Sequence, residues 1–316
     1  MNLFLATFEA VAVLLGIGIV GFLILKKDVL PTNVLRSLSP LALEIALPSI
    51  IFINIINDFN PTNSPNWWQL PLWWMFFTIV AFLLSKTFAV LSTKETKQEF
   101  TLSLFYQNGI FFPLAILTSM FAVPDEYVVS LFLLTIFFPA FFFSSYPFFF
   151  KNTKKSSPQL PLKKIFHPAF LATLIGIVLV FAGVQTQIPS LLLEIVTLLG
   201  AMTVPLLMLI LGGNIYIDSK QSESIYTKEI IKFTLIKNFA FPILFLGILL
   251  ILRPYLTPLI ALLLLLQAAV PPITALPIIT QRLDGNNVIV SQFLVASFLT
   301  SLLSLPLMVY LFQLFY

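Results

Sequence analysis

The chain has 316 residues, of which 59% are hydrophobic and 9% are charged, with 17 Lys and Arg against 13 Asp and Glu. A soluble domain of this length cannot bury so much apolar surface, so the composition excludes an ordinary water-soluble protein and predicts a membrane protein. Cysteine is absent, which excludes disulfide bonds and thiol chemistry.

Apolar stretches long enough to cross a bilayer recur along the whole chain. A hydrocarbon core about 30 Å thick requires roughly 20 apolar residues per helix. The alternation typical of a lipid-embedded barrel is missing, so helices are the spanning structure that we expect. The sequence predicts ten spans, at about 3–25, 38–57, 67–90, 100–122, 127–150, 166–184, 189–213, 229–252, 257–280 and 288–312. The first has no basic residue before it and is long enough to span, so we interpret it as a helix rather than a cleaved signal peptide.

Lys and Arg gather in the connections that follow the odd-numbered spans. Sixteen of the 17 lie there or at the adjoining helix ends, from Lys26 to Arg282, and Arg253 alone lies in an opposite connection. By the positive-inside rule the basic connections are cytoplasmic. Both termini then face outward, as an even number of spans requires. Basic residues spread over five short connections argue against a nucleic-acid partner.

The sequence contains a weak internal repeat. The longest polar stretch, KNTKKSSPQLPLKK, divides the chain into two halves with five spans each. Matched residues in the two halves are 157 to 160 positions apart, namely Gly18 and Gly176, Pro48 and Pro205, and Gln107 and Gln267. Because five is odd, the second half enters the membrane from the opposite side, a plan common among secondary transporters. We therefore expect a first five-helix repeat at 1–150, a cytoplasmic basic linker at 151–164 and a second, inverted repeat at 165–316.

The fourth and ninth spans each carry a glutamine and helix-breaking residues near their middles, in QNGIFFPLAI from Gln107 and QAAVPPITAL from Gln267. Proline removes a backbone donor and clashes with the preceding turn, and glycine loosens the turn. A broken helix in bare lipid leaves unpaired backbone groups, so we expect both breaks to lie in protein or beside a wet cavity. Two matched breaks would cross near the midplane, where their half-helix N-termini would suit an anion.

At these residues the chain resembles the auxin efflux carrier family, which includes plant auxin exporters and bacterial carriers for malate and malonate. The resemblance covers essentially the whole chain and rests on the order and spacing of five motifs. They are SLSPLALEIALPSIIF (Ser37–Phe52), QNGIFFPLAI, LGAMTVPLLMLILGGNI (Leu199–Ile215), QAAVPPITALPI (Gln267–Ile278) and VASFLTSLLSLPL (Val295–Leu307). The resemblance implies an all-α membrane protein with ten helices in two inverted repeats and crossed, broken helices 4 and 9. It further implies a scaffold part that can form a homodimer, a moving part, and a place in a bacterial cytoplasmic membrane.

The resemblance also implies roles for single residues. The family's fourth helix carries Asn and then Gly, matched here by Asn108 and Gly109, and its Asn hydrogen-bonds a substrate carboxylate. The family's crossover proline matches Pro271 or Pro272. Phe111 and Phe112 stand where the family is richer in glycine, so we expect them to narrow the cavity. The remaining residues that we assign to the substrate site are Gln107, Gln267, Pro48 and Pro205.

Polar residues within the spans are candidates for ion coupling, because charges in hydrocarbon are rare and usually functional. Glu44 either binds a coupling proton or reaches the membrane interface. Lys237 either extends to the cytoplasm or acts as a counter-charge for the substrate or Glu44. Asn54 and Asn57 either coordinate an ion or cap their helix. The sequence predicts no cofactor and no metal site, since a single His without Cys or a carboxylate cluster makes none.

We therefore expect a secondary carrier that moves a small organic anion, a mono- or dicarboxylate, with a proton or sodium ion as the candidate coupling ion. A sodium-coupled anion symporter of the bile-acid transporter type is an alternative, because it shares a related repeat plan. A membrane receptor that binds without transport is another. A membrane enzyme would need catalytic groups around a cavity, and the isolated carboxylates and one histidine do not supply them.

Overall fold

The computed structural model describes residues 3–62, 64–120, 126–149, 168–221 and 225–316. Within these ranges the secondary structure is helical, apart from one isolated β-bridge. Six helical stretches of the described chain are long and apolar enough to cross a membrane. They are Phe4–Lys26, Ser37–Asp58, Gln69–Leu91, Ser190–Ile217, Thr227–Tyr255 and Asn287–Phe315. These correspond to the predicted spans 1, 2, 3, 7, 8 and 10, and they make the chain an all-α integral membrane protein.

Each of the six stretches consists of one or more helices or helical turns. They are α1 (Leu3–Lys26), α2 (Val34–Pro40), η1 (Leu41–Ala46), α3 (Leu47–Asp58), α4 (Gln69–Phe88), η2 (Ala89–Leu91), α11 (Ser190–Ala201), α12 (Thr203–Gln221), α13 (Thr227–Leu235), η5 (Ile236–Ala240), α14 (Phe241–Leu252), η6 (Arg253–Tyr255) and α17 (Asn287–Phe315). Short 3₁₀ turns close several of them, as is common at helix ends.

The other four predicted spans are built from shorter helices. They contain α5 (Lys97–Phe105) and α6 (Phe111–Met120) in span 4, α7 (Glu126–Leu134), α8 (Phe138–Ser145) and η3 (Tyr146–Phe149) in span 5, α10 (Pro168–Phe181) in span 6, and α15 (Pro258–Ala269) and α16 (Leu276–Arg282) in span 9. The longest of these, α10, has 14 residues. The count of ten spans therefore stays a prediction, and the linker at 151–164 lies outside the described residues.

Two membrane helices widen into a π turn just before a proline. η1 precedes Pro48 and η5 precedes Pro242. Proline has no N–H to give to the carbonyl four residues earlier, and its ring collides with that carbonyl. In both helices the residue before the proline donates its N–H to the carbonyl five residues back, which is the π pattern. The prolines thus rotate the preceding turn relative to the rest of the helix.

α1 and α12 lie against each other with almost no side chain between them. A Cβ placed on Gly21 would collide with the backbone of Leu209, and one on Gly212 would collide with the carbonyl of Gly18. Small residues at such contacts let membrane helices approach closely, where dispersion rather than water exclusion holds them. α1 also packs against α17 and α6, so it lies between the helices of the first and second halves.

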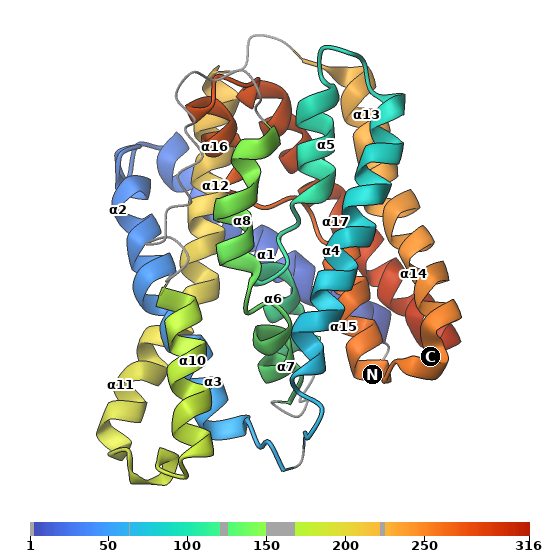
Figure 1. The fold of residues 1–316 in the computed structure, drawn as a ribbon. Coiled ribbons are helices and arrows are strands. Elements are labelled where there is room, and N and C mark those ends of the chain that lie inside the picture. Colours follow the sequence, from blue (N-terminus) through green and yellow to red (C-terminus); the bar gives the residue numbers. More distant parts are fainter. Residues whose placement is uncertain (1–2, 63, 121–125, 150–167, 222–224) are drawn as a thin grey trace.

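The helices form two groups around this central pair. α10 and α11 pack against α3 at one edge of the molecule (Figure 1). At the opposite edge, α4, α13, α14 and α15 pack together with α17. The segments around the breaks in spans 4 and 9 lie between the two groups, which places them in the middle of the membrane protein.

The two ends of the molecule differ in charge. Lys26, Lys86 and Lys220 lie at helix ends opposite the two chain termini. Arg253 lies at the other end, with its guanidinium 5.4 Å from the centre of the Tyr316 ring. The basic residues that cluster in alternate connections of the sequence thus lie together at one end of the folded molecule. Which end faces the cytoplasm remains a prediction of the positive-inside rule.

A polar clamp ties four segments together at the basic end, and we define it as Ser92, Glu99, Glu229, Lys232 and Asn286. The carboxylate of Glu229 accepts from Ser92 Oγ at 3.0 Å and pairs with Lys232 Nζ at 2.7 Å. Glu99 Oε1 accepts from the backbone N–H of Asn286 at 3.0 Å. The clamp joins the connection after α4 to α13, and the start of α5 to the start of α17, so these four segments are held together.

Candidate functional site

The two helix breaks predicted in spans 4 and 9 lie against each other in space. We define the junction as the two connecting segments, residues 106–110 between α5 and α6 and residues 270–275 between α15 and α16. The N–H of Asn108 donates to the carbonyl of Pro271 at 2.8 Å, and the N–H of Ile273 donates to the carbonyl of Tyr106 at 2.9 Å. Between these bonds, Gln107 and Pro272 form an antiparallel bridge.

The junction solves the problem that a broken helix creates inside a membrane. Helix-breaking residues leave backbone N–H and C=O groups without intrahelical partners, at a cost of several kcal/mol each in hydrocarbon. Here the two extended segments supply each other's partners. Each break therefore helps to stabilise the other.

The two matched glutamines play different parts in the junction. Gln267 is 1% exposed, and its Nε2 donates to the carbonyl of Gly109 at 2.6 Å, across the junction. Gln107 turns back to its own helix, where its Nε2 lies 3.4 Å from the carbonyl of Leu104. A Cβ on Gly109 would collide with Gln267 Oε1, so glycine leaves room for this side chain. Neither glutamine lines the cavity described next.

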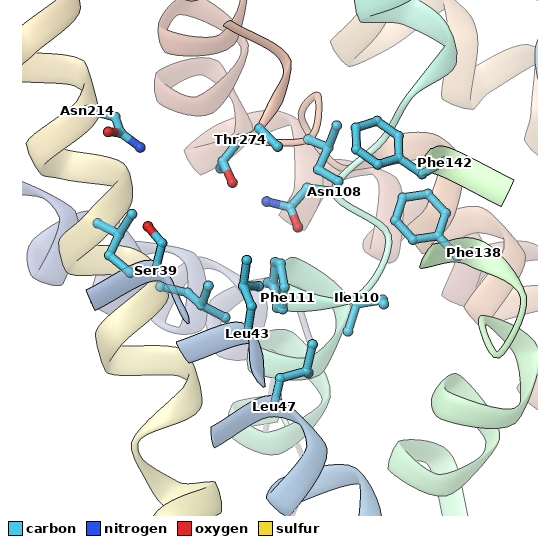
Figure 2. A pocket seen from close by; sticks show the side chains of 14 residues that line it. Ser39, Leu43, Leu47, Asn108, Ile110, Phe111, Phe138, Phe142, Asn214 and Thr274 are labelled. Atoms are coloured by element: carbon cyan, nitrogen blue, oxygen red, sulfur yellow. The ribbon is translucent and has the colours of Figure 1, made fainter. Parts of the chain in front are cut away.

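A cavity of about 190 Å³ opens beside the junction. Its polar lining comes from Asn108 and Thr274 on the junction, Ser39 on α2 and Asn214 on α12 (Figure 2). The rest of the lining is apolar and includes Leu43, Leu47, Ile110, Phe111, Phe138, Phe142, Leu207, Ile210, Ile273 and Ala275. The described residues that line it carry no charge. The junction forms one wall, and α2, η1, α3 and α12 form the opposite wall.

Asn108 is the polar group that points into this cavity without a partner. Its side chain is 1% exposed, and neither Nδ2 nor Oδ1 has a hydrogen-bond partner. Figure 2 shows the amide between Thr274 and Leu43, directed at the cavity. A buried amide without partners costs about 1–3 kcal/mol, and native structures keep such groups mainly where a ligand or water completes them. The backbone bond to Pro271 fixes the position of this residue.

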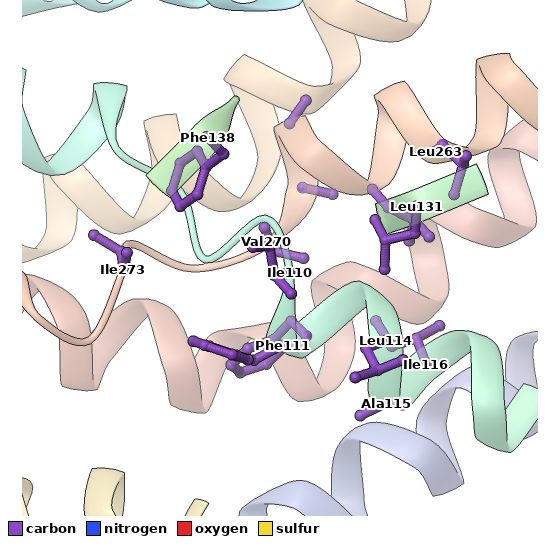
Figure 3. Close-up of a cluster of buried hydrophobic side chains, with 14 of the residues drawn as sticks. Ile110, Phe111, Leu114, Ala115, Ile116, Leu131, Phe138, Leu263, Val270 and Ile273 are labelled. Carbon is purple, nitrogen blue, oxygen red and sulfur yellow. The ribbon is translucent and has the colours of Figure 1, made fainter. Parts of the chain in front are cut away.

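Apolar packing holds the junction rigidly from the side of α6. Ile110, Phe111 and Ile273 gather with Val270 and Leu114 in one buried cluster (Figure 3). Buried side chains at native density transmit displacement rather than absorb it. The amide of Asn108 is therefore carried on a stiff support, although its segment is not helical.

The two phenylalanines expected to narrow the cavity behave differently. Phe111 lines the cavity. Phe112 points away and packs edge-to-face on Phe298 of α17, with ring centres 5.1 Å apart. Successive residues at the start of a helix diverge by about 100°, so only one of the two can face the cavity.

Several predicted site residues do not line the cavity. Pro48 shapes the turn before it, and Pro205 is exposed on α12. Glu44 is exposed on the surface of η1. Asn54 donates its Nδ2 to the carbonyl of Ile50 at 2.7 Å, one turn earlier in its own helix. The structure thus separates these residues from Asn108.

Lys237 lies behind the junction rather than in the cavity. It is fully buried in η5, and its Nζ donates to the carbonyl of Ala268 at 3.2 Å. The neighbouring Asn238 exchanges hydrogen bonds with Ser297 and donates to Ser304 on α17. The side chain of Lys237 therefore contacts the end of α15 and does not reach Glu44.

Sequence reasoning did not single out three polar residues of the cavity. Ser39, Asn214 and Thr274 were part of quoted motifs, but Ser, Asn and Thr are common in membrane helices. Asn214 follows the glycine pair Gly212–Gly213, where α12 approaches α1, and that pair was the one available signal. Only the fold shows that these three residues face Asn108.

A second, more polar cavity of about 530 Å³ lies at the end of the molecule where α3 and α10 meet. Its polar lining comes from Asn57, Asn60, Thr62, Gln185 and Thr186. Asn57, a predicted ion ligand or cap, thus belongs to a cavity distinct from that of Asn108. Among the described residues, no group of three or more His, Cys, Asp or Glu is placed to hold a metal ion.

Apolar helices that enclose a cavity beside two interrupted segments are typical of membrane transport proteins. A family model with that description, membrane transport protein, matches residues 6–159 and, a second time, residues 150–309. The chain therefore belongs to this family, the auxin efflux carrier family of membrane transporters. The resemblance read from the five motifs is confirmed. A search of curated proteins finds no match to the chain.

Proposed function

We propose that the protein is a secondary carrier for a small organic anion, a mono- or dicarboxylate, which binds in the cavity beside the junction. The observation that carries this proposal is the buried amide of Asn108, which faces the cavity with both polar atoms unpaired. The amide N–H₂ supplies two donors for a carboxylate. Transport by alternating access would then expose this site to each side of the membrane in turn.

Electrostatics favour an anion at this place. α6 begins at Phe111 and α16 begins at Leu276, both a few residues after junction residues that line the cavity. Helix N-termini carry unsatisfied N–H groups and a partial positive charge of roughly half an elementary charge. The end of α6, together with neutral hydroxyl and amide groups, would hold a carboxylate without an ion pair. Binding of that strength also permits release, which a carrier requires.

The architecture that we propose is ten helices in two inverted five-helix repeats, with helices 4 and 9 crossing at the junction. The twofold match of the family model supports the repeat, and the antiparallel bridge between Gln107 and Pro272 supports the crossing. In this proposal the helices held by the polar clamp, α5, α13 and α17, move together with the junction against α2, α3 and α12. The cavity lies between the junction and α2, α3 and α12, so such a motion would open it.

The test is flux in sealed vesicles. Purified protein is reconstituted, and uptake of labelled malate, malonate, lactate and indole acetate is measured under imposed pH, sodium and voltage gradients. We expect saturable flux of at least one acid, and a loss of about tenfold or more in Vmax/KM for Asn108→Ala, equivalent to one charge-assisted hydrogen bond. Asn33→Ala is the matched control, because Asn33 caps α2 with no side-chain hydrogen bond and lies outside the cavity.

The result also separates the alternatives. Flux that Asn108→Ala leaves unchanged would remove the cavity as the substrate site. Flux that requires a sodium gradient would favour the symporter of the bile-acid transporter type. Saturable binding of an acid by protein that shows no flux would identify a receptor instead of a carrier.

A further inference from the structure

Lys237 is a fully buried lysine in the membrane part of the chain, and it does not line the substrate cavity. Its Nζ donates to Ala268 O at 3.2 Å and lies 5.0 Å from the centre of the Phe241 ring. Among the described residues, no carboxylate lies within 4.0 Å of it. A buried charge without a partner is strongly unfavourable. The contacts with the Ala268 carbonyl and the Phe241 ring therefore explain why a lysine is tolerated at this position.

Consecutive prolines create the acceptor that Lys237 binds. In a continuous helix, the N–H groups at positions 271 and 272 would donate to the carbonyls of Gln267 and Ala268. Pro271 and Pro272 have no N–H, so these carbonyls lose their helical donors. α15 therefore ends with free acceptors and with the negative end of its dipole at the junction. Lys237 supplies a donor and a positive charge at that point.

The matching half-helix in the first half of the chain ends differently. α5 ends at Phe105, and the side chain near its last carbonyls is the neutral amide of Gln107, 3.4 Å from Leu104 O. The two half-helices are thus capped by groups of different charge. Of these two ends, the described residues place a lysine only at that of α15, whose glutamine also reaches across the junction to Gly109.

We propose that Lys237 is a fixed positive charge of the carrier. Its ammonium caps α15 and offsets the negative end of that half-helix beside the anion cavity. Lys237 is a positioning residue, because it acts on the cavity through Ala268, Gln267 and Gly109. Its effect on transport rests on the proposed function, whereas its effect on stability does not.

The first test is thermal unfolding of the purified full chain in detergent, in sodium, potassium or choline chloride at equal ionic strength. We expect the wild-type midpoint to be the same in all three salts. Lys237→Ala should unfold at a lower temperature, and ethylammonium, which fits the space left by the side chain, should raise its midpoint selectively. Lys228→Met is the matched control, because Lys228 is exposed on the adjoining α13. A sodium-specific rise in the wild-type midpoint, or an unchanged midpoint in Lys237→Ala, would overturn the proposal.

A second pair of variants covers the case in which Lys237→Ala does not fold. Lys237→Arg keeps the charge and Lys237→Gln keeps only a donor. We expect the arginine variant to fold and to be the more stable of the two, since the charge is the essential property. Equal behaviour of both variants would show that a donor alone suffices, and the proposal would fail.

The second test is transport by folded Lys237→Gln in vesicles. Loss of the positive charge should raise the KM for the anion about five- to tenfold, with a smaller change in Vmax, because the exposed dipole end opposes an anion nearby. A purely structural cap would lower the amount of active protein and Vmax while KM stayed the same. Absence of wild-type flux with every acid, together with the expected unfolding results, would refute the proposed carrier function and leave the capping role intact.

Discussion

At the scale of residues, the amide of Asn108 has no hydrogen-bond partner in the folded chain but faces a cavity in which a ligand could supply one. Its backbone is held by a 2.8 Å bond, while its amide has no partner although it is buried. Functional sites are commonly the places where local stability is sacrificed. The motif predicted the position of Asn108, but only the structure shows that its amide is unpaired and that Ser39, Asn214 and Thr274 face it.

This unpaired state gives a prediction about stability. Asn108→Ala removes no hydrogen bond of the side chain and relieves a desolvated amide, so we expect the free energy of unfolding to stay constant or to rise by about 1 kcal/mol. Thermal unfolding in detergent measures it beside the transport assay. A fall in the midpoint of several degrees would mean that the amide has a structural partner in the folded protein.

Gly109 and Gln267 should behave as one unit. Gly109→Ala collides with Gln267 Oε1 and disturbs the 2.6 Å bond, at a cost of roughly 1–3 kcal/mol in the free energy of unfolding. Gln267→Ala loses the same bond but makes space for the new methyl group.

We therefore expect the double variant to be less destabilised than the sum of the two single variants, by about 0.5 kcal/mol or more. Unfolding midpoints of the four proteins close this double-mutant cycle. Strict additivity would show that the two residues do not interact in the protein.

At the scale of elements, the sequence predicted the breaks in spans 4 and 9 because Gly and Pro mark them directly. It did not predict how the breaks are stabilised, since the partners are backbone groups about 165 residues away, which no local pattern encodes. The π turns before Pro48 and Pro242 were likewise not predicted. A proline in a membrane helix can produce a kink or a widened turn, and the surrounding packing decides which.

Close packing of α1 on α12 yields a matched pair of variants within one helix. Gly21→Ala should destabilise the protein by about 1–3 kcal/mol, because the new methyl group meets the backbone of Leu209. Gly16→Ala meets nothing within 4 Å and should be neutral or stabilise the helix by about 0.5–1 kcal/mol. Unfolding midpoints that ranked the two variants in the opposite order would contradict the α1–α12 contact.

At the scale of the whole molecule, composition alone predicted a helical membrane protein, and six long apolar helices agree with it. Spans 4 and 9 are interrupted because they contain the breaks, where the facing segment of protein rather than lipid satisfies the backbone. The membership of the family was predicted from motif order. The position of the cavity, between the junction and the helices α2, α3 and α12, required the structure.

The orientation in the membrane can be tested with single introduced cysteines, because the chain contains no native cysteine that would be labelled as well. Single cysteines are introduced at Lys94, in the basic connection after α4, and at Tyr255, which is 76% exposed at the opposite end. With the basic end in the cytoplasm, a membrane-impermeant maleimide applied to intact cells should label Tyr255→Cys and not Lys94→Cys. Permeabilised cells and the cysteine-free parent are the controls, and the reverse pattern would invert the proposed topology.

The neutral lining of the cavity has an electrical consequence. In a transport cycle the charges of the protein move in one direction while substrate is bound and return when the site is empty. Their contributions cancel, so the net charge moved across the membrane per cycle is the charge of the substrate. For a monovalent anion and no co-transported ion, an inside-negative potential of 100 mV then favours exit by about 2.3 kcal/mol, or about fifty-fold in concentration. Under the proposed carrier function such a potential would drive export, and the recorded current would report turnover directly.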